Sequence, residues 1–130
     1  MSMKISFPGG LAIAAEIDGF NVLTDQPEQN GGEGTAPSPF DLFLASLGTC
    51  SGFFALRFCQ QRNLSTEGLG LTLDFERDPQ TRKLMRVKMN IQLPDGFPDK
   101  YRKAIIRATE ECAVKKVIAD PPEFEVTAGS

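Results

Sequence analysis

The chain has 130 residues, 41% of them hydrophobic and 24% charged, which is the length and composition of one ordinary globular domain. Its formal net charge of -3 at pH 7 provides no positive field to gather phosphates, which argues against nucleic acid or an anionic membrane as a partner. Three cysteines at scattered spacings, with no signal peptide at the start, argue against a secreted disulfide framework and favour the reducing cytoplasm.

The first 24 residues alternate between apolar and other side chains around two turn signals. Apolar positions run through 5–7, 11–17 and 20–22, and the turns fall at Pro8-Gly9-Gly10 and at Asp18-Gly19. This pattern predicts a three-stranded antiparallel meander. Residues 25–38 are rich in glycine, proline and polar groups, which predicts a loop.

A long helix is predicted from residue 39 to about Gln61. Ser38 is a plausible N-cap, Pro39 suits the first helical position, and Asp41 complements the helix dipole. The uncharged stretch 42–56 is shorter than the roughly 20 residues of a membrane span and contains hydroxyl side chains. Because the helix is apolar on every side, we expect a buried core helix, partly covered by a second subunit.

The next region predicts a β-hairpin. Residues 69–75 and 85–93 alternate between apolar and polar side chains, and Asp78-Pro79-Gln80-Thr81 separates them. The outward acids of the first strand and the outward bases of the second are expected to pair across the hairpin; they are Asp74, Glu76, Arg86 and Lys88.

A second helix is predicted to open at Pro98-Asp99. Its apolar positions follow a helical spacing that would place Cys112 on the inner face; they are Tyr101, Ile105, Ala108 and Cys112. The apolar pattern continues to Asp120, after a bend or without one, and Phe124 and Val126 then suggest a short terminal strand. The predicted fold class is therefore α+β.

The chemistry open to this chain is limited by its composition. It contains no histidine, which excludes Ser-His and Cys-His nucleophile arrangements and most catalytic zinc sites, and it has no C-x-x-C. We therefore expect no metal and no other cofactor. Cysteine chemistry remains, and Cys59 points roughly opposite to Cys50 on the helix, so the pair to consider is Cys50 and Cys112.

Two readings of this pair remain open. In the first interpretation both side chains are simple packing residues, because free cysteines are among the most buried residue types. In the second interpretation they are reactive thiols. Cys50 is too far along its helix for the dipole to lower its thiol pKa, so a cation is needed. Arg57, seven residues on, and Lys115, just after Cys112, are candidates.

Several segments together resemble a known family. The run Asp25-Gln26-Pro27, Gly31-Gly32, Pro37-Ser38-Pro39 and 42–50 (LFLASLGTC) resembles the first-cysteine signature of the OsmC/Ohr proteins, the osmotically inducible and organic hydroperoxide resistance proteins. Cys112-Ala113-Val114 resembles the second signature, which usually reads Cys-Pro-Val. The resemblance covers nearly the whole chain and implies a single OsmC-like domain over residues 1–130.

The resemblance implies an intertwined homodimer and a thiol-dependent reduction of organic hydroperoxides in oxidative stress defence. In that mechanism Cys50 attacks the peroxide, Cys112 resolves the product as a disulfide, and a cellular dithiol restores both thiols. Family peroxidases place a Glu ten residues before the first cysteine and an Arg in the N-terminal half. Here Phe40 occupies the first position, with Asp41 next to it, and no Arg precedes Arg57.

These departures leave a second function open, that of a ligand-binding protein. A non-peroxidase member of the same fold would bind a small thiol or a hydrophobic molecule at the dimer interface. Aromatic side chains on the long helix, Phe40, Phe53 and Phe54, would line such a site.

Overall fold

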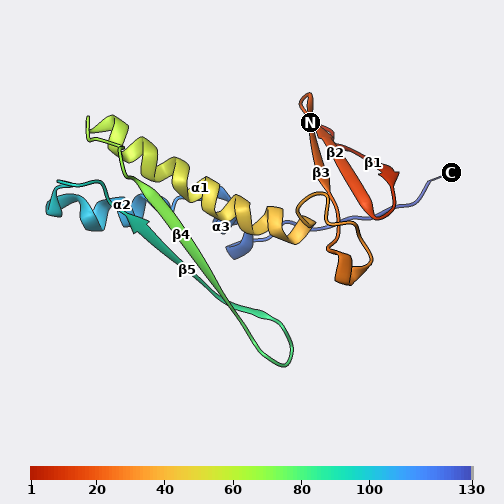
Figure 1. Ribbon diagram of the computed structural model, residues 1–130. Coiled ribbons are helices and arrows are strands. Elements are labelled where there is room, and N and C mark those ends of the chain that lie inside the picture. Colours follow the sequence, from red (N-terminus) through yellow and green to blue (C-terminus); the bar gives the residue numbers. More distant parts are fainter. Residues whose placement is uncertain (130) are drawn as a thin grey trace. The chain divides into compact units, whose positions relative to one another are not determined.

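The structure is a computed structural model that describes residues 1–129 (Figure 1). The fold is α+β, with antiparallel strands and helices. Contacts within the chain divide it into two compact units, residues 1–45 and the residues from Ser46 onward, and α1 contributes to both. One domain over residues 1–130 stays a prediction.

The first unit contains the predicted meander. Strands β1 (Lys4–Gly9), β2 (Ala12–Ile17) and β3 (Phe20–Thr24) form one antiparallel sheet in the order β1-β2-β3. Asp18 and Gly19 join β2 to β3 with φ angles of 47° and 82°. Two positive φ angles are typical of the two-residue turn whose twist matches that of the strands. The meander prediction is confirmed.

The loop after β3 is organised by one buried carboxylate, that of Asp25, which is 2% exposed. Its oxygens accept hydrogen bonds from the N–H groups of Gln26 (2.7 Å), Glu33 (3.3 Å) and Thr35 (3.1 Å), and from the Thr35 hydroxyl (2.7 Å). The Thr35 hydroxyl and then these N–H groups hold the pKa of Asp25 below its ordinary value. The loop, which includes the short 3-10 helix η1 (Glu28–Asn30), therefore has a defined conformation.

Helix α1 (Pro39–Gln61) has the predicted boundaries. The Ser38 hydroxyl accepts a hydrogen bond from the N–H of Asp41 at 3.1 Å, as expected of an N-cap. By length and composition α1 could cross a membrane, but core helices of soluble proteins pass the same test.

In the single chain α1 is buried on one side only, and its cover by a second subunit stays a prediction. One face is buried, and it consists of Leu47, Ser51, Ala55, Phe58 and Cys59. Phe53 is 54% exposed and Leu56 is 38% exposed. The reason is geometric: within its unit the helix packs against one hairpin and one short helix, which together cover only part of its circumference.

Strands β4 (Gly70–Arg77) and β5 (Leu84–Gln92) form the predicted hairpin, and its charges pair as expected. Asp74 lies opposite Lys88, and Glu76 lies opposite Arg86. The Glu76 carboxylate contacts Lys88 at 2.8 Å and Arg86 at 3.8 Å. All of these side chains are well exposed, so the pairs set register more than stability.

The hairpin approaches α1 closely at one glycine. A Cβ at Gly48 would lie 3.2 Å from a methyl carbon of Leu73, tighter than an ordinary contact. The core of this second unit lies further along α1, where Ala55, Phe58 and Cys59 pack with Ile105 of α2.

The C-terminal region differs from the prediction in two ways. It consists of the 3-10 helix η2 (Asp99–Tyr101), α2 (Arg102–Thr109) and α3 (Ala113–Ala119). Cys112 is buried as predicted but does not lie on a helix face, because α2 ends at Thr109 and Cys112 is the N-cap of α3, with φ -52° and ψ 121°.

The predicted terminal strand around Phe124 and Val126 is not formed. Residues 121–129 have no regular structure, and these two side chains are 86% and 93% exposed. Among residues 1–129 no strand pairs with this segment, and a lone strand leaves its backbone groups unpaired. Pro121 and Pro122 also lack the N–H that a ladder requires.

Candidate functional site

The structure brings Cys50 and Cys112 into contact. Cys50 lies in the middle of α1 and Cys112 at the start of α3, and their side chains are hydrogen-bonded to each other. Cys112 is 0% exposed, whereas Cys50 is half-buried. Two thiols 62 positions apart in the sequence therefore share one site, and only one of them is open to solvent.

The sulfur of Cys112 lies among several hydrogen-bond donors. Burial raises the pKa of this thiol, but the N–H of Lys115, the Cys50 thiol, the N–H of Val114 and the Ser51 hydroxyl oppose burial and together outweigh it. The net pKa of Cys112 is lower than that of a free thiol. The N–H groups are available because the first turn of a helix has no carbonyl partners for them.

Sequence reasoning did not identify two residues that support this site, Ser51 and Thr109. The Ser51 side chain is fully buried, and its single hydroxyl proton is shared between the Cys112 sulfur and the Thr109 carbonyl, which lies 3.3 Å from the hydroxyl oxygen. The Thr109 hydroxyl in turn bonds the Ile106 carbonyl at 2.6 Å, at the end of α2. The available signal was a serine directly beside Cys50 in the uncharged stretch 42–56.

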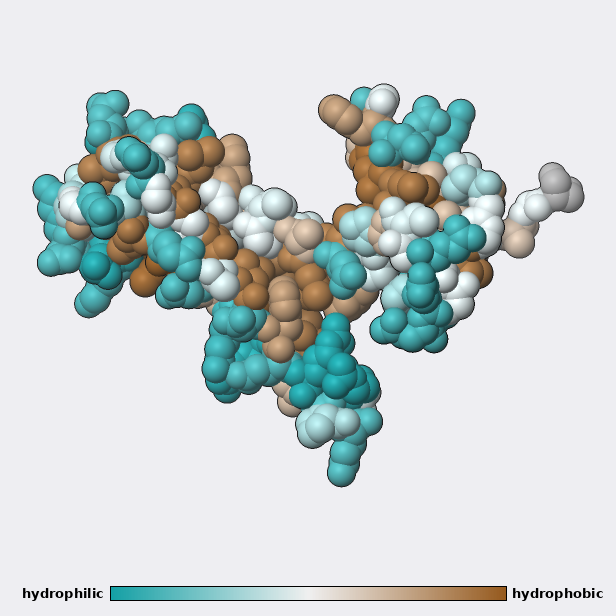
Figure 2. Space-filling model, in the orientation of Figure 1, coloured by the Kyte–Doolittle hydropathy of each residue, from teal (hydrophilic) through white to brown (hydrophobic). Residues whose placement is uncertain are grey.

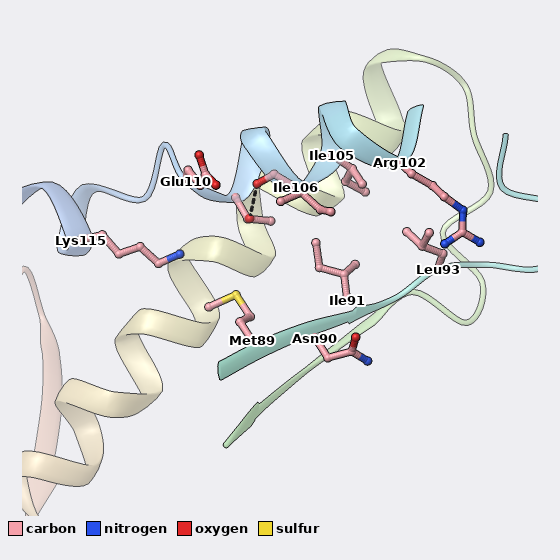
Figure 3. A pocket seen from close by; sticks show the side chains of 10 residues that line it. Met89, Asn90, Ile91, Leu93, Arg102, Ile105, Ile106, Glu110 and Lys115 are labelled. Carbon is pink, nitrogen blue, oxygen red and sulfur yellow. Dashed lines mark hydrogen bonds between the residues drawn. The ribbon is translucent and has the colours of Figure 1, made fainter. Parts of the chain in front are cut away.

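Lys115, a predicted activating residue, contacts Cys112 through its backbone N–H. Its side chain lines a cavity of about 350 Å³ between β5 and α2 (Figure 3). Figure 3 shows Lys115 and Arg102 at opposite ends of this cavity, with apolar side chains between them; these include Met89, Ile91, Leu93, Ile105 and Ile106. Asn90, Thr109 and Glu110 complete the lining, so the cavity is apolar in its middle and polar toward its ends.

Arg57, the other activating candidate, donates to the Gln60 side chain at 3.4 Å. It lines a second cavity, of about 480 Å³, together with Phe53 and Phe54, whose rings meet edge to face at 5.2 Å. These predicted binding residues therefore lie together in the second unit.

The remaining predicted site residues, Phe40 and Asp41, belong to the first unit. Phe40 packs against Phe43 with ring centroids 5.5 Å apart, and Asp41 is exposed. Both line a cavity of about 650 Å³ formed with the loop 26–38.

Cys59 has the surroundings of a packing residue. It is fully buried in the core with Ala55, Phe58 and Ile105. Burial raises the pKa of its thiol, and the positive charge of Arg62 opposes this only in part. A thiol that stays protonated is a poor nucleophile, so Cys59 is expected to be inert.

The environment of Cys112 predicts a thiolate below the ordinary thiol pKa of about 8.5. Titration followed by the ultraviolet absorbance of the thiolate should show this ionisation in the intact protein and lose it in Cys112→Ser. Ser51→Ala removes one donor and should move the transition to higher pH. An unchanged transition in Ser51→Ala would contradict the role given to that hydroxyl, and Ser46→Ala is the matched control on the same helix.

Comparison with known proteins identifies similarities over most of the chain. Residues 32–127 match the family described as OsmC-like protein. A search of curated proteins gave no match.

Solved structures share the fold at low identity. A protein from Psychrobacter arcticus 273-4, assigned to an osmotic stress induced and detoxification response, is 24% identical, with a TM-score of 0.75 over 89% of this chain and 86% of that one. An OsmC-like protein from Mycoplasma pneumoniae is 13% identical, with a TM-score of 0.71 over 92% and 87%. The organic hydroperoxide resistance protein OsmC from Legionella pneumophila is 21% identical, with a TM-score of 0.56 over 91% and 89%.

Proposed function

The chain belongs to the OsmC-like protein family, and from this premise we propose that it reduces organic hydroperoxides through Cys50 and Cys112. The observation that carries the proposal is the contact between these two thiols, beside donors that lower the pKa of one of them. The similarity in fold to an organic hydroperoxide resistance protein from Legionella pneumophila supports the same reaction class.

The difference in exposure between the two thiols supports the roles that we propose for them. A hydroperoxide must reach the sulfur that it oxidises, and Cys50 is half-buried whereas Cys112 has no exposed surface. Cys50 is therefore the peroxidatic residue and Cys112 the resolving residue.

The reaction then balances in three steps. The Cys50 thiolate attacks the terminal oxygen of the hydroperoxide, the O–O bond breaks, and the alcohol leaves with a proton, so that Cys50 becomes a sulfenic acid. The Cys112 thiolate attacks the Cys50 sulfur, the S–S bond forms, and the hydroxyl group leaves as water after taking up a proton. A cellular dithiol returns two electrons by thiol–disulfide exchange.

The apolar cavity between β5 and α2 is the space we assign to the organic part of the hydroperoxide. It borders Lys115 and Thr109, which contact Cys112 and Ser51 through backbone groups. A volume of about 350 Å³ is at the lower end of the range of small-molecule sites. The preference should therefore be for compact organic hydroperoxides.

Thiol counting tests the proposed function. The reduced protein is mixed with one equivalent of cumene hydroperoxide, and free thiols are counted after unfolding. Loss of two of the three thiols per chain is expected, whereas three remaining thiols would contradict the proposal.

The second candidate function, binding of a small thiol or hydrophobic ligand without peroxidase chemistry, is favoured by Phe40 and by the absence of any Arg before Arg57. The same experiment separates the two functions. A ligand-binding protein would keep all of its thiols after exposure to the hydroperoxide.

A homodimer in the cytoplasm completes the proposal. The single chain exposes large apolar side chains on α3 and after it, including Val117 and Ile118 at 52% and 53% and Phe124 at 86%. Figure 2 shows apolar surface on both units, while the tip of the hairpin is hydrophilic. A second copy would bury this apolar surface.

Light scattering from the purified protein should therefore give twice the mass of the chain. Ile118→Asp would place a charge in the contact and should shift the mass toward that of one chain. Lys103→Asp, on the exposed side of α2, is the control. A single-chain mass for the unmodified protein would contradict the dimer.

A further inference from the structure

The groove between α1 and α2 is lined by residues that have no role in the proposed reduction of hydroperoxides. Its cavity of about 480 Å³ combines three arginines with three phenylalanines. The arginines are Arg57, Arg62 and Arg107, and the phenylalanines are Phe53, Phe54 and Phe58. Cationic and aromatic side chains thus line a single hollow in a chain whose net charge is negative.

The positive charges of this groove lack carboxylate partners within the part of the chain that the structure describes. Among residues 1–129, none of the three guanidinium groups forms an ion pair with a carboxylate. The acidic side chain that lines the cavity, Glu111, is held by Lys116 at 2.6 Å. Like charges gathered without a counter-charge repel one another, so an anion in the groove would be favoured.

One of the guanidinium groups is already held in place. The Arg62 side chain stacks over the Phe58 ring at 3.6 Å from its centroid and donates to the Phe58 carbonyl at 3.2 Å. Its planar group also lies 5.6 Å from the centroid of the Tyr101 ring. A cation ordered in this way loses little conformational entropy when it binds an anion.

The apolar part of the groove indicates what is attached to the anionic group of the ligand. The Phe53 ring is 54% exposed and packs edge to face against Phe54, so an aromatic surface is open beside the cations. We propose that this groove binds an organic anion, a carboxylate, sulfonate or phosphate group attached to a compact apolar body. The anion pairs with Arg57 and Arg107, and the body packs on the phenylalanines.

Calorimetry with two probes of the same shape tests this site. Naphthalene-2-sulfonate carries the charge, and naphthalene-2-sulfonamide has the same ring system without it. We expect the sulfonate to bind at least tenfold more tightly than the sulfonamide, and added salt to weaken only the sulfonate. Arg57→Gln and Arg107→Gln should each weaken the sulfonate about tenfold, because each removes one charge-assisted hydrogen bond.

Arg86→Gln is the matched control, since Arg86 is an exposed arginine of the hairpin and does not line the groove. It should leave the affinity unchanged. Equal binding of the two probes, or equal affinities in the arginine variants and the unmodified protein, would overturn the proposal. So would a change of oligomeric mass in those variants without a change in sulfonate affinity, because the groove would then be a contact between copies.

Discussion

Replacing Cys50 with serine is expected to lower the rate of organic hydroperoxide reduction by about a thousandfold or more, because the substitution removes the nucleophile itself. The serine hydroxyl has nearly the same size, so the packing of α1 should be retained. The rate is followed as dithiol-dependent loss of cumene hydroperoxide.

Cys112→Ser should give a different defect. Cys50 would still be oxidised, but the sulfenic acid would lack its resolving thiol, which can be detected by trapping with dimedone and mass spectrometry. Cys59→Ala is the control, since Cys59 is a buried packing residue. It should lower stability and leave two-cysteine turnover in place. Full activity in Cys50→Ser would exclude the assigned roles.

The second large effect is expected from Asp25→Asn. The carboxylate accepts four hydrogen bonds, from three N–H groups and one hydroxyl. An amide replaces one acceptor oxygen with a donor, which then faces N–H groups for which residues 1–129 offer no other acceptor. The amides of Glu33 and Thr35 should exchange with solvent at least about tenfold faster, and the midpoint of thermal unfolding should fall by about 5 °C or more.

Glu33→Gln, which removes an equal charge from the exposed side of the same loop, is the control and should have little effect.

The stabilisation by Asp25 should depend on pH in a defined direction. Because the folded-state pKa of Asp25 is depressed, its contribution to stability is present above the unfolded pKa of about 3.9 and is lost as the pH falls through the folded value. The difference between protein and variant should therefore be constant near neutral pH and shrink in acid. Its persistence at low pH would contradict this origin.

Local patterns predicted most of the fold. The meander, α1 and the hairpin follow from alternation, turn residues and an N-cap, all of which act over a few neighbouring residues. The pairing of Glu76 with Arg86 and Lys88 was also predicted, since opposite strands of a hairpin have a fixed register. The family resemblance was confirmed by the match of residues 32–127.

The position of Cys112 shows where periodicity fails. The helical spacing of Tyr101, Ala108 and Cys112 predicted one continuous helix. In the structure α2 ends at Thr109 and α3 begins at Ala113. The usual form of the family's second signature, Cys-Pro-Val, would indicate the start of a new helix. It places proline at the first helical position, where a missing N–H costs nothing. Ala113 removes that signal from this sequence while the break remains.

The exposure of α1 and of Phe124 has another cause. A helix that is apolar on every side indicates full burial, yet one chain of 130 residues leaves Leu56 38% exposed. Sequence patterns report which side chains avoid water but do not say which chain covers them. The hydrogen-bond donors around Cys112 could not be predicted from sequence patterns either, because Ser51 and the N–H of Lys115 reach its sulfur only in the folded chain.

The central claim is that Cys50 and Cys112 form one redox pair. Peptide mapping by mass spectrometry, after one equivalent of cumene hydroperoxide and alkylation of the remaining thiols, tests it most directly. We expect a peptide in which Cys50 and Cys112 are joined by a disulfide, with Cys59 alkylated. Cys50 and Cys112 both alkylated after that treatment would contradict it.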